Sequence, residues 1–166
     1  MALKQTEQIF NERLAECYDE LKWLYMELYH DEHAFAYFVQ MLKQFYEERP
    51  ASLRKWDEKR IAQKDWYKGN QMLGMVMYVN AFGGTINGVL KHLDYVKSCG
   101  VNYLHLMPLL ESPQGRSDGG YAVSNFRKVD PSLGSMEDLA ALAKECHRNE
   151  ISLCLDFVMN LSLIHI

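Results

Sequence analysis

The chain has 166 residues, of which 48% are hydrophobic, and it carries a formal net charge of −4. This length and composition support a domain with its own core and exclude an intrinsically disordered chain. The mildly acidic balance, without a basic patch, argues against nucleic acid or an anionic membrane as partner.

The cysteines and the amino terminus indicate the compartment. Four cysteines lie at apolar helix or strand positions with neither a CxxC pair nor metal-ligand spacing, so we expect reduced core residues. They are Cys17, Cys99, Cys146 and Cys154. No run of about 20 apolar residues is present for a membrane span. The amino terminus also lacks the apolar centre of a secretory signal, and we expect a cytoplasmic protein.

Residues 1 to about 65 follow a helical pattern. One apolar stripe with alternating spacings of four and three predicts a single long amphipathic helix; its members are Phe10, Leu14, Cys17, Leu21, Leu24 and Leu28. A second helix is expected from a cap at Asp31 to Pro50, and a third after a cap at Ser52. We assign residues 1–70 to a helical domain. Its aromatic stripe suits either packing within the chain or a partner-binding or coiled-coil surface.

From residue 72 the pattern becomes that of an α/β fold. We expect buried strands in LGMVMYVNAF, VNYLHLM and ISLCLDFV. The first two are separated by a helix from Ile86 that stops at Gly100. A long loop, residues 108–134, precedes a second helix, which Ser135 and Asp138 open as a capping box and Asn149 ends.

This order of strands and helices predicts parallel crossover units, since parallel neighbours need a connection that crosses the sheet. The polar segments SDGGY and 156–160 follow strand ends. Such carboxyl ends are where parallel sheets keep their binding sites, so we expect a binding floor at this edge. Three strands do not close a barrel, and we interpret the chain as an amino-terminal piece of a larger protein, with LSLIHI as an atypical tail.

Three segments in a fixed order resemble the amylosucrase branch of the α-amylase superfamily, glycoside hydrolase family 13. They are YLHLMPL, SDGGYAVSNFRKVDPSLGSMEDL and LDFVMN. The resemblance is close over Met75–Asn160 and looser over the helical residues 1–70. It implies that residues 71–160 form the first three strands of a (β/α)8 TIM barrel, and that residues 161–166 are atypical.

The resemblance also implies roles for individual residues. Asp118 matches the carboxylate that binds glucose hydroxyls, and Tyr121 the aromatic platform beneath the same sugar, with Gly119 and Gly120 bringing both into one pocket. Asp156 matches the aspartate that supports the site without being the nucleophile. The alternative for SDGGY is a plain turn in which Asp118 bonds nearby amides, and for Asp156 a carboxylate that caps a turn.

The carboxyl-terminal part of the resemblance departs from the family. Asn160 matches the family's asparagine, but Leu161 stands where the family has a histidine that contacts the glucosyl unit. We assign no metal and no cofactor. No carboxylates of this chain match the family's nucleophile or acid/base, so we expect the chain by itself to be inactive.

The implied activity is that of a retaining glucosyltransferase that takes glucose from sucrose, passes it to an α-1,4-glucan and releases fructose. A sucrose hydrolase, or another α-glucosidase or α-amylase of the superfamily, is the alternative enzyme. A non-catalytic carbohydrate-binding or scaffold module is the alternative of another class.

Two histidines are further candidates for functional groups. His105 alternates with Leu104 and Leu106, so it either points into the barrel towards a sugar or is a satisfied core histidine. Cys146 and His147 are adjacent on a helix and point about 100° apart, which disfavours a thiol dyad. GGTING lacks the spacing of a nucleotide-binding loop.

Overall fold

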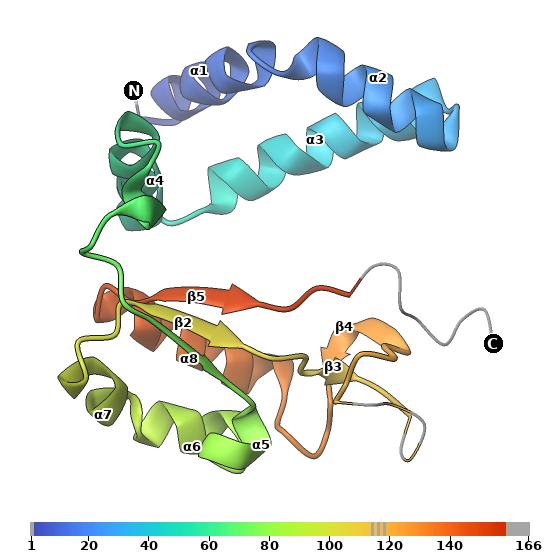
Figure 1. Cartoon of the computed structure of the whole chain (residues 1–166). Coiled ribbons are helices and arrows are strands. Elements are labelled where there is room, and N and C mark those ends of the chain that lie inside the picture. Colours follow the sequence, from blue (N-terminus) through green and yellow to red (C-terminus); the bar gives the residue numbers. More distant parts are fainter. Residues whose placement is uncertain (1, 114, 116, 118, 159–166) are drawn as a thin grey trace. The chain divides into compact units, whose positions relative to one another are not determined.

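The computed structural model describes residues 2–113, 115, 117 and 119–158, in two compact units, 1–63 and 64–166. The first unit is helical (Figure 1). It contains α1 (Ala2–Ala15), α2 (Tyr18–Tyr29), α3 (Glu32–Glu48) and α4 (Ala51–Ala62). Helices are therefore confirmed here, while the assignment of residues 1–70 to the family's helical amino-terminal domain stays a prediction.

The first helical stripe does not form one helix, as expected, but two. The chain tightens at Cys17, whose amide donates to the Leu14 carbonyl at 3.1 Å and whose φ and ψ are −129° and 4°. The stripe continues across this break because a short turn keeps the helical phase. Apolar spacing reports which face is apolar, and it does not report whether the backbone is continuous.

The caps of the next two helices differ from each other. Asp31 accepts from the Ala34 amide at 2.9 Å, as predicted, and His30 before it adopts a left-handed conformation with φ 50°. Ser52 is not the cap of α4, because that helix begins at Ala51 with Pro50 in the cap position. Proline is suited to a helix start, where its missing N–H costs nothing.

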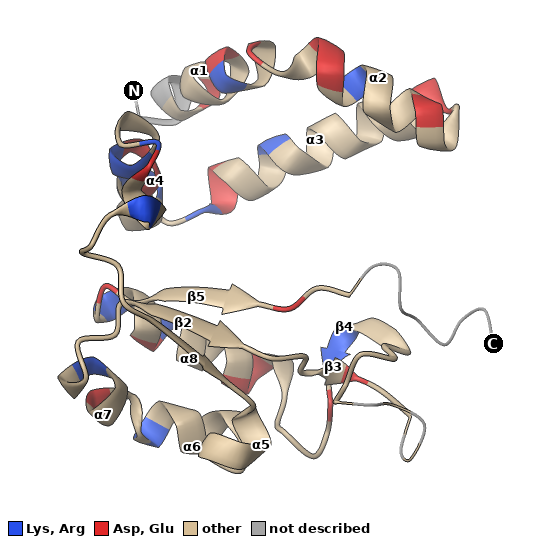
Figure 2. Ribbon diagram, viewed as in Figure 1, with Lys and Arg blue, Asp and Glu red and all other residues tan. Residues whose placement is uncertain are grey.

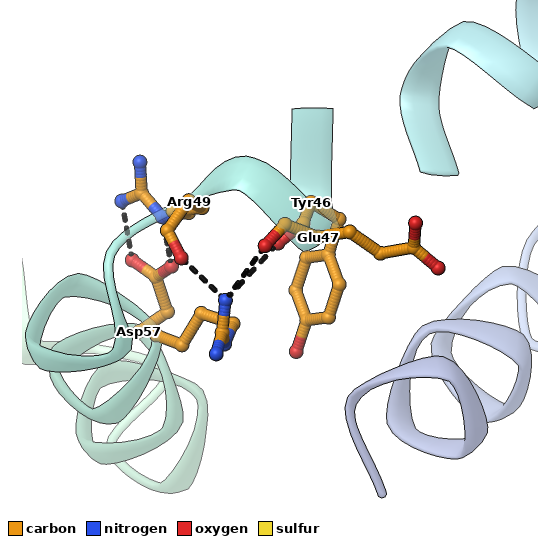
Figure 3. A network of polar contacts seen from close by, with 5 residues as sticks. Tyr46, Glu47, Arg49 and Asp57 are labelled. Atoms are coloured by element: carbon orange, nitrogen blue, oxygen red, sulfur yellow. Dashed lines mark hydrogen bonds and ion pairs between the residues drawn. The ribbon is translucent and has the colours of Figure 1, made fainter. Parts of the chain in front are cut away.

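Two arginines fix the turn between α3 and α4 (Figure 3). The Arg49 guanidinium donates to both oxygens of Asp57, at 2.6 and 2.9 Å. Arg54 donates to the carbonyls of Tyr46, Glu47 and Arg49, which lie at the end of α3. These carbonyls have no partner within the helix, so a cation there satisfies them and offsets the helix dipole.

The second unit is built on a parallel sheet (Figure 1). The 3-10 helix η1 (Trp66–Lys68) precedes β1 (Gly74–Met77), which pairs with β2 (Tyr103–Leu106), and β2 pairs with β5 (Ser152–Leu155). Val76 and Cys154 both lie opposite His105 in the register. The predicted α/β class with parallel strands is confirmed.

Helices cover one face of this sheet. They are α5 (Val79–Phe82), α6 (Ile86–Lys91), α7 (Leu93–Ser98) and α8 (Met136–Arg148). Ile86, Leu104 and Leu142 are fully buried between strands and helices, and they belong to one core cluster. Ser135 and Asp138 form the predicted capping box of α8. On the other face Val76 is 62% exposed.

Three expectations about this unit were wrong in detail. The first strand ends at Met77, and Val79–Phe82 form the helical turn α5 instead of continuing it. The helix expected from Ile86 to Gly100 is interrupted at His92, which separates α6 from α7. The long loop contains an antiparallel hairpin, β3 (Leu110–Glu111) with β4 (Asn125–Val129), which residue types alone did not indicate.

Surface charges of both signs are interspersed in both units (Figure 2). Lys22 pairs with Glu32 at 3.0 Å and Lys43 with Glu7 at 2.5 Å. Exposed pairs of this kind contribute little to stability. No helix among the described residues has the length and apolarity needed to cross a membrane.

All four cysteines are free. Cys146 is buried, as predicted, and Cys154 is half-buried. Cys17 and Cys99 are exposed, which contradicts the core assignment for those two. Both lie in cap positions at helix ends, where Cys17 precedes α2 and Cys99 follows α7.

Candidate functional site

Asp156 stands at the carboxyl end of β5, directly after the last paired residue. Its amide donates to the Leu106 carbonyl at 3.2 Å, so the ladder between the strands holds its backbone. Side chains alternate between the faces of a strand. Because Cys154 lies opposite His105, Asp156 two residues later shares the face of His105, which is the face that the helices do not cover.

The carboxylate of Asp156 joins two side chains from other segments. His105 Nε2 lies 2.9 Å from Asp156 Oδ1, and the Tyr121 hydroxyl donates to Asp156 Oδ2 at 3.1 Å. A carboxylate accepts only, so Nε2 of His105 carries the proton in this bond. The His105 and Asp156 side chains are 28% and 25% exposed, which leaves the group accessible to a ligand.

The loop that carries Tyr121 turns through two glycines. Gly119 and Gly120 have φ values of 61° and 86°, which side-chain-bearing residues rarely adopt. A Cβ on Gly120 would lie 3.1 Å from both Cβ and the carbonyl oxygen of Pro108. The Ser117 hydroxyl accepts from the Ala122 amide at 3.0 Å and closes the turn. Glycine at 120 is thus required for conformation and for space.

The environment of Tyr121 favours its neutral phenol. Burial raises the pKa of Tyr121 above its ordinary value, and the hydrogen bond to Asp156 raises this pKa further. The neutral phenol is the donor that Asp156 needs, and an ionised phenolate beside this carboxylate would repel it. At neutral pH the ring is therefore held in one orientation by its own hydroxyl.

The structure brings together only part of the predicted site. Tyr121 and Asp156 are in direct contact, and Gly119 and Gly120 form the turn. Asp118 and Asn160, the other predicted site residues, lie outside the described residues. The parts of the chain that the structure describes contain no cluster of three or more metal-ligating side chains. Asp156 uses both oxygens on protein groups, and its direct contact with a sugar stays a prediction.

His105 and Tyr78 are the residues for which the sequence was least informative. The two alternatives for His105 were a core position and a site position, and its bond to Asp156 places it in the site. Tyr78 was not singled out, although a Cβ on Gly119 would lie 3.1 Å from its hydroxyl. The available signal was its place directly after β1, at the same edge as Asp156.

Comparison with known proteins identifies the family of the chain. The model of the family described as alpha amylase, catalytic domain, matches residues 9–163. The chain belongs to this family. Because the match begins inside the helical unit, it does not mark a boundary between residues 1–70 and the barrel. Membership confirms that the parallel strands and their helices are part of the family's barrel domain.

Several relatives carry the names of enzymes that hydrolyse or form sugars. Trehalose-6-phosphate hydrolase of Bacillus subtilis is 36% identical over 46% of this chain and 13% of its own length. Trehalose synthase/amylase of Mycolicibacterium smegmatis is 42% identical over 49% of this chain and 14% of its own. An isomaltulose synthase mutant of Erwinia rhapontici in complex with D-glucose superposes with a TM-score of 0.51 and 29% identity, over 54% of this chain and 17% of that one.

These alpha-amylase relatives limit what the family assignment says about activity. The chain aligns with 13% to 18% of the length of the curated relatives. They include hydrolases and synthases, and the comparisons support the α-glucosidase alternative at least as well as the amylosucrase branch. The family is thus shown, and the activity of the whole protein is left to the proposal below.

Proposed function

We propose that the carboxyl edge of the sheet forms part of a glucosyl-binding site in a retaining enzyme that acts on α-glucosides. The observation that carries this proposal is the 3.1 Å hydrogen bond from Tyr121 to Asp156. It fixes an aromatic ring at the sheet edge of an alpha-amylase catalytic domain, where parallel barrels keep their sites. One face of a fixed ring is a suitable platform for the apolar C–H face of a pyranose.

The neighbouring groups supply polarity and orientation. Asp156 holds the Tyr121 hydroxyl, and His105 donates to the other oxygen of the same carboxylate at 2.9 Å. A platform held in this way loses little rotamer entropy when a sugar binds, and this improves the affinity. Asp118, directly before the glycine turn, is the carboxylate that we expect to accept from two glucose hydroxyls.

For the donor we propose sucrose, with an α-1,4-glucan as acceptor. The motif SDGGYAVS, in which the amylosucrase branch differs from other members, supports this choice. In a retaining reaction one carboxylate attacks the anomeric carbon while a second protonates the leaving fructose, and the acceptor then displaces the enzyme. The residues argued here bind and orient the glucosyl unit, and those two carboxylates are further groups of a complete barrel.

Hydrolysis of an α-glucoside is the second candidate. The relatives that favour it are the trehalose-6-phosphate hydrolase and an oligo-1,6-glucosidase of Heyndrickxia coagulans, which is 35% identical over 77 residues. Both candidates need the same glucosyl site, and they differ in whether water or a sugar displaces the enzyme. In a protein in which the strands of this chain belong to a complete barrel, sucrose would yield glucan by transfer and free glucose by hydrolysis.

Sugar titrations of the chain test the shared part of the proposal. Methyl α-D-glucopyranoside and sucrose should shift the NMR signals of the Tyr121 ring, with a dissociation constant on the order of 1 mM or weaker. Fructose and methyl β-D-galactopyranoside should not. Methyl α-D-glucopyranoside and sucrose should also shift the NMR signals of His105, which shares Asp156 with Tyr121. Tyr121→Ala should abolish these His105 shifts, whereas Tyr37→Ala on the exposed side of α3 should leave them unchanged. Equal shifts with all four sugars would contradict a glucosyl site.

A further inference from the structure

Tyr78 reaches the candidate site from the end of β1, which lies on the other side of β2 from Asp156. It follows β1 directly and has an extended backbone, with φ −82° and ψ 130°. Val76 lies opposite His105 in the register, so Tyr78 two residues later shares the uncovered face with His105 and Asp156. Since β2 lies between β1 and β5, Tyr78 and Asp156 flank the strand of His105 from its two sides.

The hydroxyl of Tyr78 lies directly against the glycine turn. A Cβ on Gly119 would be 3.1 Å from Tyr78 Oη, and 3.6 and 3.7 Å from Cδ2 and Cε2 of Tyr121. The 3.1 Å approach requires the Tyr78 hydroxyl or the turn to move by a few tenths of an ångström, whereas the distances to the Tyr121 ring are ordinary van der Waals contacts. Gly119 therefore lies between the Tyr78 hydroxyl and the Tyr121 ring, although these residues come from the end of β1 and from the loop.

The Tyr121 ring is also restrained at its hydroxyl end. Asp156 accepts from that hydroxyl at 3.1 Å, so a displacement of Gly119 away from Tyr78 would pull the ring from the carboxylate. Tyr78 is also among the groups that raise the pKa of Tyr121, after burial and Asp156, which agrees with its closeness. Tyr78 itself is 39% exposed.

We propose that Tyr78 is a positioning residue, whose hydroxyl supports the backbone of Gly119 and thereby holds the Tyr121 ring against Asp156. Its consequence for sugar binding rests on the proposed function, whereas its effect on Tyr121 does not. Tyr78 and Gly119 are then coupled sterically. A residue larger than glycine at 119 displaces the turn while the Tyr78 hydroxyl is present, and displaces it less when the hydroxyl is absent.

A double-mutant cycle on the full chain tests this coupling without any sugar. The readout is the pKa of Tyr121, measured by NMR on ¹³C-labelled tyrosine. In Gly119→Ala this pKa should fall towards that of an ordinary tyrosine, because the hydroxyl leaves Asp156. In Gly119→Ala/Tyr78→Phe it should return towards the wild-type pKa. A double variant that titrates like Gly119→Ala overturns the proposal.

A matched control separates steric contact from backbone strain. Gly84 has φ 74°, and a Cβ there would meet no atom within 4 Å. Gly84→Ala therefore carries a similar strain without the contact, and Tyr78→Phe should neither enhance nor relieve its effect. Coupling of equal size at Gly84 would overturn the proposed contact. If Gly119→Ala does not fold, as judged by circular dichroism, Tyr78→Leu alone should lower the pKa of Tyr121, and an unchanged pKa overturns the proposal.

Titration of the same variants with methyl α-D-glucopyranoside distinguishes the two proposals. Gly119→Ala should weaken binding at least several-fold, and the added Tyr78→Phe should restore part of it. If the Tyr121 titrations follow the cycle but no variant binds the glucoside, the proposed function fails while the positioning role stands. If the glucoside binds wild type and Gly119→Ala equally and their Tyr121 titrations coincide, the positioning role fails.

Discussion

In the helical unit, Phe35 at 2% exposure is the one buried apolar side chain among those that the structure describes there, whereas the sheet unit buries a continuous cluster. The helical unit also has a groove of about 640 Å³. It is lined by apolar rings and chains that include Phe10, Leu21 and Phe45. Both units have clear apolar patterns in the sequence, but only one of them converts its pattern into a closed core.

This contrast shows what an apolar pattern determines. A stripe fixes the phase of a helix, which is local information. Burial requires a second surface that faces the stripe, which is non-local information. In the sheet unit the parallel strands and the helices next to them in the chain contribute side chains to one core cluster, so the second surface is present. Stability should therefore depend strongly on apolar residues in the sheet unit and weakly on those of the helical unit.

Truncation of a core leucine should give the largest change in the free energy of unfolding. Leu104→Ala removes a side chain with 0% exposure in β2 and should lower the free energy of unfolding by about 2–5 kcal/mol. Leu28→Ala in α2, where the side chain is 74% exposed, should change it by less than about 0.5 kcal/mol. Urea unfolding followed by circular dichroism measures both. Equal losses would show that the helical unit depends on its exposed stripe.

Replacement of a turn glycine tests the sheet edge. Gly120→Ala should cost roughly 1–3 kcal/mol more than Gly84→Ala. Both residues have positive φ, but only the Cβ at 120 meets Pro108, at 3.1 Å. The difference between the two variants in thermal or urea unfolding isolates this close approach. If the two variants lose the same stability, the backbone of Pro108 moves away without cost.

Removal of a helix cap should have a smaller and similar effect in both units. Asp31→Ala removes the cap of α3, and Ser135→Ala that of α8, and each should cost about 1 kcal/mol. Capping is a local hydrogen bond, so it does not depend on the core around it. A loss at Ser135 several times that at Asp31, in parallel unfolding experiments, would show that capping and core packing are not independent.

The smallest effect at neutral pH concerns the buried thiol. Burial raises the pKa of Cys146 to about 11, since the core disfavours the thiolate. The folded state holds the neutral thiol, so its stability is unaffected by this group below pH 9 and falls as the pH rises from 9 through about 11. At pH 8 a thiol reagent should modify the exposed Cys17 and Cys99 and leave Cys146 intact. Fast modification of Cys146 in the folded chain, identified by mass spectrometry, would contradict its burial.

The fold was predictable where local signals and tertiary structure agree. Ser135, Asp138 and Asp31 are capping residues with short-range partners, and each forms the bond that the sequence predicted. The sequence was less informative where one apolar pattern suits two backbone conformations. The break at Cys17 leaves the helical phase intact, and α5 forms from residues that also suit a strand.

The candidate site shows the same division. Tyr121 and Asp156 were predicted as site residues at one edge of the sheet, but the hydrogen bond that joins them across 35 positions was not predicted. Residue types alone favoured a turn for the segment around Gly119. The role of Tyr78 depends on a 3.1 Å approach between a strand end and a loop, which no periodicity in the sequence reports.

The central claim is that the Tyr121 ring, held by Asp156, is the platform for a glucosyl unit. Its most direct test is an isotope-filtered nuclear Overhauser measurement on the chain, with ¹³C-labelled tyrosine and unlabelled methyl α-D-glucopyranoside. The account predicts contacts between the ring protons of Tyr121 and the C–H protons on one face of the pyranose, and their loss in Asp156→Asn. Contacts of the sugar with other tyrosines, such as Tyr37 or Tyr95, and none with Tyr121 would contradict it.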